Sequence, residues 1–273
     1  GIQRALRILQ ELSGVLVCDE VGLGKTFIAG EIIRIASKRA RQKVLVVVPA
    51  SLKDSTWIPF LERFDLVSAR VKVVTFDDVR IGTKPELRDL DEYSLVVIDE
   101  AHNLRNLATQ RSEAVVELLR GEHPKKVVLL TATPVNNSLE DLYALISYFV
   151  LDDSKFLGHG IASIRDYIKA AQRRDPDTLS PEHLFDLMDQ VAVRRTRRFI
   201  KKHYAGDKIL NNEGEKVPIV FPTPVLTRLD YDLSDAASAL ADVVFAAFAV
   251  SEDDELVLGP TDEPVAGKLT LAR

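Results

Sequence analysis

The feature that most restricts the fold of this chain is a glycine-rich turn between an apolar run and an amphipathic segment. The turn reads Asp19-Glu20-Val21-Gly22-Leu23-Gly24-Lys25-Thr26. Before it, the apolar run Gly14–Cys18 predicts a buried strand, and after it residues 25–41 predict a helix with isoleucines on its apolar face. A strand, a glycine turn and a helix in this order are typical of an open parallel sheet covered by helices.

The rest of the first half repeats this alternation. Two amphipathic segments, Thr109–Arg120 and Leu139–Phe149, predict further helices. Apolar runs predict four more strands, at Val44–Val48, Val71–Phe76, Leu95–Asp99 and Val127–Thr131. The fold class is therefore α/β, a doubly wound parallel sheet, with an appended helical segment because residues 163–200 look helical.

Composition narrows the setting in which the chain works. Apolar residues make up 46% and charged residues 28%, and no apolar run reaches the roughly 20 residues that a membrane span needs. The single cysteine, Cys18, cannot form an internal disulfide, which favours a reducing compartment. We therefore expect a soluble, intracellular protein in the cytoplasm, associated with the nucleoid if it is bacterial, and no membrane partner.

A local basic stretch is the only compositional sign of a phosphate-rich partner. The net charge of −5 and the pI of about 5.6 do not indicate a nucleic-acid-binding protein. One short stretch nevertheless carries six basic residues and no acidic one: Arg194, Arg195, Arg197, Arg198, Lys201 and Lys202. Taken alone, the stretch is equally consistent with a solvated helix face.

The glycine turn predicts a site for a nucleoside triphosphate. Glycines let the backbone N–H groups point inward at phosphate oxygens, and the start of the helix adds its positive dipole end. Lys25 would neutralise the terminal phosphates, and the Thr26 hydroxyl would bind Mg²⁺. The expected nucleotide-binding residues are Glu20, Val21, Gly22, Leu23, Gly24, Lys25 and Thr26. The usual P-loop pattern has glycine where this chain has Asp19, so a glycine turn with an incidental lysine is the alternative.

Two later motifs place polar residues after predicted strands. The run Leu95–Ile98 ends in Asp99 and Glu100, which puts two carboxylates at the edge of the sheet where open α/β folds bind ligands. Asp99 is expected to hold Mg²⁺, and Glu100 to deprotonate the attacking water; a strand that merely ends in a charged turn is the alternative. Thr131 and Thr133 precede Pro134 and either stabilise a turn or couple the nucleotide site to a moving partner.

Taken together, these motifs resemble those of a known family. The glycine loop, Pro49-Ala50-Ser51-Leu52 with Trp57 downstream, Asp-Glu-Ala-His at 99–102 and Leu-Thr-Ala-Thr-Pro-Val-Asn-Asn at 130–137 occur in the order seen in the SWI/SNF-like branch of superfamily II helicase-type ATPases. Val193-Arg194-Arg195-Thr196 is similar to a short motif after the first lobe of that branch, and the Val21 form of the loop is closer to bacterial members.

The resemblance implies a P-loop NTPase with two RecA-like lobes that close on ATP and Mg²⁺ and move along double-stranded DNA. Lys25, Asp99 and Glu100 would be catalytic, with Thr26 and Asp99 at the metal. The coupling residues would be His102, Thr131 and Thr133. The DNA-tracking face would include Ser51, Lys53, Trp57, Thr75, Arg194 and Arg195. Such DNA contacts would be independent of sequence and sensitive to salt.

The expected organisation has three parts. Residues 1–150 would form the first RecA-like lobe, residues 151–216 a helical protrusion with a basic linker, and residues 217–273 the beginning of the second lobe. The family's adenine-selecting glutamine motif would lie before Gly1, and its arginine finger after Arg273. We therefore expect this chain to bind nucleotide but to hydrolyse it poorly until it is paired with the second lobe.

Other functions remain open at this level. Within the family, a strand-separating helicase is the nearest alternative. A nucleotide-dependent switch that controls a protein partner without translocation is a second, and a partner-docking module with a vestigial ATP site is a third. The intact Lys25, Asp99 and Glu100 argue against decay of the site. The sequence does not identify the pathway among repair, transcription recycling, remodelling and phage defence.

Overall fold

The computed structural model describes residues 1–121, 123–135, 138–172, 181–204, 208–210, 216–218 and 221. The chain divides into two compact units, residues 1–219 and residues 220–273. The first unit contains every helix and strand described below. The expected beginning of a second lobe at residues 217–273 lies almost wholly outside the described residues.

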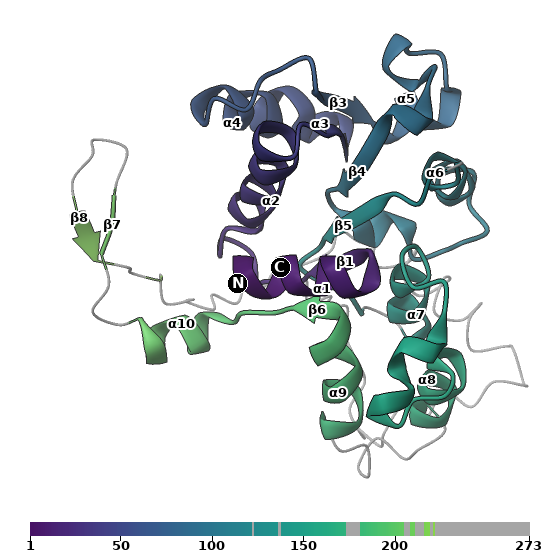
Figure 1. The fold of residues 1–273 in the computed structure, drawn as a ribbon. Helices are drawn as coiled ribbons and strands as arrows, with labels where there is room; N and C mark the ends of the chain where they lie inside the picture. The colour runs from purple at the N-terminus through teal and green to yellow at the C-terminus, as the bar shows by residue number, and fades with distance from the viewer. Residues whose placement is uncertain are drawn as a thin grey trace, which may run out of the picture. The chain divides into compact units, whose positions relative to one another are not determined.

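A six-stranded parallel sheet forms the centre of the first unit, in the order β3-β2-β4-β5-β1-β6 (Figure 1). Every pairing between neighbouring strands is parallel, which confirms the predicted α/β sheet. The strands are β1 (Gly14–Val17), β2 (Lys43–Val48), β3 (Val71–Thr75), β4 (Tyr93–Ile98), β5 (Lys126–Leu130) and β6 (Ala192–Val193). A separate antiparallel pair joins β7 (Lys208–Leu210) and β8 (Lys216–Pro218).

The apolar runs become strands because helices cover both faces of the sheet. Residues of β1, β2, β4 and β5 are buried almost without exception, and Val44 to Val48 are 0% exposed. A strand buried on both faces needs apolar side chains in succession instead of alternating polar ones. The valine-rich runs of this chain meet that requirement, and β-branched side chains also suit the extended backbone.

Helices form a layer on each side of the sheet. Right-handed crossovers place α2, α3 and α4 on one face and α5 and α6 on the other, and Figure 1 shows these two groups apart. Contacts between α5 and α6 agree with this division, and α1 contacts α2. The helices are α1 (Ile2–Leu12), α2 (Lys25–Arg34), α3 (Ala50–Leu52), α4 (Ile58–Arg63), α5 (Phe76–Ile81), α6 (Gln110–Leu119), α7 (Glu140–Ile146), α8 (Ile164–Gln172), α9 (Pro181–Val191) and α10 (Arg197–His203). Shorter π-helical and 3₁₀ turns lie at Ile35–Arg39, Lys53–Trp57, Pro85–Leu87, Leu90–Glu92, Ala101–Leu104 and Asp153–His159.

The structure differs from two sequence-based expectations about these elements. The strand predicted through Phe76 ends at Thr75, because the Thr75 hydroxyl accepts the backbone N–H of Asp78 and Asp78 accepts that of Thr75, which begins α5. Residues 163–200, expected to form helical segments interrupted by a turn at residues 174–177, also contain β6, which pairs with β1. Backbone pairing with β1 overrides helix propensity there, so the basic stretch begins at the sheet edge.

The topology brings the ends of three adjacent strands together. β4, β5 and β1 are neighbours, and their carboxyl ends all face the same edge because the strands are parallel.

No helix in the described part of the chain combines the length and the apolar composition that a membrane span requires.

Candidate functional site

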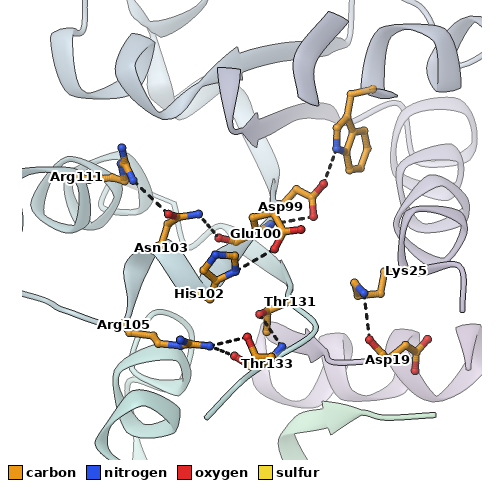
Figure 2. Close-up of polar contacts among 11 residues, drawn as sticks. Asp19, Lys25, Asp99, Glu100, His102, Asn103, Arg105, Arg111, Thr131 and Thr133 are labelled. Atoms are coloured by element: carbon orange, nitrogen blue, oxygen red, sulfur yellow. Dashed lines mark hydrogen bonds and ion pairs between the residues drawn. The ribbon is translucent and has the colours of Figure 1, made fainter. Parts of the chain in front are cut away.

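Polar residues from three motifs meet at the carboxyl edge of the sheet. Asp19 follows β1, Asp99 follows β4 and Thr131 follows β5. The ladder continues into these residues, since the N–H of Thr131 donates to the Val17 carbonyl at 3.0 Å and that of Asp99 to the Val47 carbonyl at 2.9 Å. Figure 2 shows Lys25, Asp99, Glu100 and Thr131 together at this edge. The structure thus assembles motifs that lie up to about a hundred residues apart in the sequence.

The glycine loop has the backbone of an anion-binding turn. Gly22 and Gly24 adopt φ angles of 81° and 85°, which side chains disfavour, so glycine is needed at both positions. Gly24 caps α2, so the first N–H groups of that helix begin at Lys25 and Thr26. Unpaired N–H groups and the helix dipole at such an end attract phosphate. Nζ of Lys25 donates to the Asp19 carbonyl at 3.0 Å, which keeps the ammonium group over the loop (Figure 2).

Asp99 is held by two hydrogen bonds. Its carboxyl group is nearly buried, with the residue 8% exposed. Oδ2 accepts the indole Nε1–H of Trp57 at 2.8 Å, and Oδ1 accepts the backbone N–H of Glu100 at 2.8 Å. Each oxygen keeps a further lone pair, and carboxylate and threonine hydroxyl oxygens are hard donors that suit Mg²⁺. Asp99 and the half-buried Thr26 therefore fit the expected metal.

The expected role of Trp57 on a DNA-tracking face is wrong. Trp57 is 0% exposed, so no part of its ring is available to a ligand on the surface. It lies at the end of the π-helical turn Lys53–Trp57, where its apolar ring packs in the core and its N–H reaches Asp99. A buried indole needs a partner for its N–H, and here that partner is the expected metal-binding carboxylate. Trp57 therefore orients Asp99 from behind.

Replacing Trp57 with phenylalanine is expected to destabilise the protein. Phenylalanine leaves Oδ2 of Asp99 without the indole donor, and an unsatisfied buried acceptor costs about 1–3 kcal/mol. The free energy of unfolding, from urea titration followed by circular dichroism, should fall by about that amount. In an Asp99→Ala background the same substitution should cost less, because the acceptor is already gone. Equal losses in both backgrounds would show that the lost hydrogen bond is not the cause.

Glu100 occupies a constrained position beside Asp99. Its φ angle is 49°, in the left-handed region that non-glycine residues seldom adopt. Oε2 lies 2.9 Å from Nδ1 of His102, and the Glu100 carbonyl accepts the backbone N–H of Asn103 at 3.0 Å and its Nδ2 at 2.9 Å (Figure 2). Strained residues of this kind cluster at active sites when surrounding contacts hold them. The contact with His102 orients the Glu100 carboxylate, and the hydrogen bonds from Asn103 hold the Glu100 backbone.

The two threonines after β5 connect to the loop of Asp99 through Arg105, which sequence reasoning missed. Thr131 is 0% exposed, and its hydroxyl accepts the backbone N–H of Thr133 at 3.2 Å. The Arg105 guanidinium donates to Oγ1 of Thr133 at 2.8 Å and also to its carbonyl, and lies 3.9 Å from Asp141 (Figure 2). Only the position of Arg105, three residues after His102, could have suggested this link.

The side chain of Arg195, another expected DNA contact, lies against the glycine loop. Its guanidinium forms an ion pair with the buried Asp19 carboxylate, and it donates to the Leu23 carbonyl at 3.1 Å. Its Nε and Nη2 are engaged within the glycine loop, and contact of this residue with DNA stays a prediction. Burial raises the pKa of the neighbouring Cys18 thiol to about 12, so Cys18 remains a neutral thiol beneath the loop.

The side chains of the remaining candidates for DNA contact differ in their exposure to solvent. Ser51 and Arg194 are exposed. Lys53 is half-buried, with its Nζ 4.0 Å from Oδ2 of Asp78, and the Thr75 hydroxyl caps α5. Ser51 and Arg194 therefore have the most accessible side chains of this set.

Comparisons with known proteins agree with this geometry. The family model of the SNF2-related domain matches residues 66–210. The chain is 31% identical over 234 residues to the uncharacterized ATP-dependent helicase YqhH of Bacillus subtilis, a match that covers 81% of this chain and 39% of that protein. The chain thus spans about two fifths of the length of that relative.

Two solved structures of Sulfolobus solfataricus are similar to this chain. The SWI2/SNF2 ATPase core domain matches with a TM-score of 0.53 and 22% identity, over 73% of this chain and 43% of that one. The same core in complex with double-stranded DNA matches with a TM-score of 0.49 and 23% identity, over 71% and 43%. The first of these likenesses supports the fold, and the family match covers more than half of the sequence. The chain belongs to the SNF2-related domain family, in the SWI/SNF-like branch of the helicase-type ATPases.

Proposed function

We propose that this chain is the ATP-binding lobe of a DNA-dependent ATPase that translocates along double-stranded DNA. The observation that carries the proposal is the meeting of the glycine loop, Lys25, Asp99 and Glu100 at one sheet edge. A loop for phosphates beside two carboxylates from the next motif suits hydrolysis of ATP to ADP and phosphate.

The residues divide the chemistry among them. Lys25 and the N–H groups at the start of α2 bind the phosphates. Bound Mg²⁺, held by Thr26 and Asp99, would neutralise charge that develops on the phosphate oxygens. Glu100 orients a water molecule and takes its proton. The hydrogen bond from Trp57 to Asp99 and the contact between His102 and Oε2 of Glu100 keep the two carboxylates in place before ATP arrives.

Coupling to movement is assigned to the contacts after β5. Thr131 and Thr133 lie next to the site, and Arg105 joins Thr133 to the loop that carries Glu100 and His102. A change in the Glu100 loop on hydrolysis would therefore be passed to Thr133. The second RecA-like lobe would close on this edge and supply the arginine finger, which is typically worth about 10³–10⁵ in rate. This chain by itself is therefore proposed to hydrolyse ATP weakly.

DNA binding is proposed for exposed polar and basic side chains. Ser51 and Arg194 are both exposed, as are Lys201 and Lys202 in α10. Contacts from such residues go to phosphates and carry no sequence information. The net charge of −5 means that this attraction is local instead of spread over the whole surface.

Duplex DNA is expected to raise the ATPase rate of the protein that carries both lobes. The affinity for DNA should fall with salt, since contacts to as few as two phosphates give about a tenfold loss for a fourfold rise in salt. Replacing Arg194 with glutamine should reduce the slope of log affinity against log salt by about 1. The control is Arg39→Gln, which changes an arginine at the C-terminal end of the helical segment that begins with α2.

The assays that test this proposal separate its parts. An ATPase rate indifferent to duplex DNA would remove the DNA-dependent claim. Displacement of a triplex strand without separation of the duplex would support translocation. Strand separation would instead favour the helicase activity that the name of the Bacillus relative carries.

A further inference from the structure

The glycine loop of this chain contains a buried carboxylate beneath its phosphate-binding face. Asp19 is 0% exposed and stands where the usual loop pattern has glycine. Within the loop, the left-handed φ angles occur at Gly22 and Gly24, so the backbone at position 19 does not require glycine. The substitution is sterically allowed, but it adds a negative charge next to a site for anions.

Arg195 compensates that charge at close range. The backbone N–H of Arg195 donates to Oδ1 of Asp19 at 2.7 Å, and its Nε donates to Oδ2 at 2.9 Å. Its Nη2 donates to the same Oδ2 and to the Leu23 carbonyl at 3.1 Å. Both oxygens of Asp19 are therefore satisfied, and one guanidinium reaches both the beginning and the middle of the loop.

The backbone of the same residue completes the connection. The Arg195 carbonyl accepts the N–H of Glu20 at 3.2 Å, which extends the pairing of β1 and β6 into the loop. The next residues add to it, because the Arg197 N–H donates to Oε2 of Glu20 at 3.0 Å and its Nη2 to the Val21 carbonyl at 3.2 Å. The first half of the loop is thus held by a segment far away in the sequence.

We propose that Arg195 is a positioning residue for nucleotide binding, which neutralises Asp19 and holds the loop in its phosphate-binding shape. The inference rests on the proposed binding of a triphosphate at this loop. Without the guanidinium, Asp19 would be an uncompensated buried charge that repels phosphate and lacks hydrogen-bond donors. Arg195 does not need to touch the nucleotide, since it acts through Asp19 and the Leu23 carbonyl.

Linkage gives the proposal a second consequence. If the contacts of Arg195 and Arg197 favour the loop shape that binds phosphate, then bound nucleotide must favour those contacts by the same factor. Nucleotide would therefore order the segment that begins at Arg194 and continues into α10. Through that segment, the ATP site would influence the chain that follows it.

The test measures binding of a fluorescent ATP analogue with Mg²⁺ to the 273-residue chain and to its variants. Arg195→Gln is expected to bind at least about tenfold more weakly, a loss that corresponds to about 1.4 kcal/mol. Arg195→Lys keeps the charge but not the fork of donors, so it should bind with intermediate affinity. The double variant Asp19→Asn with Arg195→Gln should recover most of the affinity, because the buried charge is gone. The matched control is Arg198→Gln, an exposed arginine of the same segment.

A second readout does not depend on nucleotide. Hydrogen exchange of the peptide that covers residues 20–24 should be faster in Arg195→Gln than in the unchanged protein, with no ligand present. Should Arg195→Gln fail to fold, Arg195→Lys carries both measurements. Thermal unfolding of every variant separates a local change in the loop from a global loss of structure.

The outcomes separate this inference from the proposed function. If the unchanged chain binds no nucleotide, the proposed function fails, while the exchange measurement still tests the contact between Arg195 and the loop. If the unchanged chain binds and Arg195→Gln binds equally well, the inference is overturned and the function stands. Equal weakness of Arg195→Gln and the double variant would overturn the charge compensation by Arg195.

Discussion

Glu100→Gln is expected to lower ATP turnover by about 10²–10⁴-fold, the usual range for loss of a general base. Glutamine has nearly the same shape and can still form a hydrogen bond to Nδ1 of His102, which lies 2.9 Å from Oε2 in this structure. It cannot accept a proton from water. Binding of ATP should therefore change little while hydrolysis is lost. The measurement is phosphate release by the protein that carries both lobes, beside the binding of a fluorescent ATP analogue.

A matched glutamate provides the control for this prediction. Glu113→Gln makes the same chemical change at an exposed position on α6 and should leave turnover unaffected. Turnover in Glu100→Gln within a few-fold of the unchanged protein would assign the proton transfer to another group. The same variant also separates a motor from a switch, since a pure switch would keep its partner binding in the ATP state.

Lys25→Ala is expected to weaken ATP binding by about 10–100-fold, because a hydrogen bond to a charged group contributes about 1.5–3 kcal/mol. Nζ of Lys25 donates to the Asp19 carbonyl at 3.0 Å, which keeps the ammonium group beside the place where phosphates would lie. Alanine removes the cation and leaves the glycine turn intact. The measurement is titration of the chain with a fluorescent ATP analogue, and turnover should fall with binding.

An exposed lysine tests whether the loss is specific to the loop. Nζ of Lys38 forms an ion pair with Asp65 on the surface, so Lys38→Ala should bind ATP normally. Equal affinity of Lys25→Ala and the unchanged chain would show that the loop does not bind phosphate through this lysine.

Much of the fold followed from local patterns. The five strands expected in the first half all form within a residue or two of their predicted ends, because runs such as Val44–Val48 are apolar enough to be buried on both faces. The capping box at Thr75 and Asp78 also lay in the sequence, and reading it would have predicted α5. β6 could not be found this way, because two residues carry no periodicity and the strand exists only through its pairing with β1.

In the candidate site too, motifs of consecutive residues were predicted and contacts between distant residues were not. The glycine loop and the carboxylate pair carry their chemistry within a few consecutive residues, so their types and order predicted a phosphate loop beside two carboxylates. Trp57 and Arg195 were assigned to the DNA face, whereas the indole of Trp57 donates to Asp99 and the guanidinium of Arg195 holds Asp19. The link from Arg105 to Thr133 was missed for the same reason, since the two residues are far apart in the chain.

By itself, the sequence determined a parallel α/β sheet with a glycine-rich loop at the end of its first strand. Those properties depend on neighbouring residues: apolar runs become buried strands, and glycine is required where φ is positive. Only the tertiary structure decided how Asp19 is tolerated in that loop. Its partner, Arg195, follows 176 residues later, and the pair meets because β6 joins the sheet beside β1.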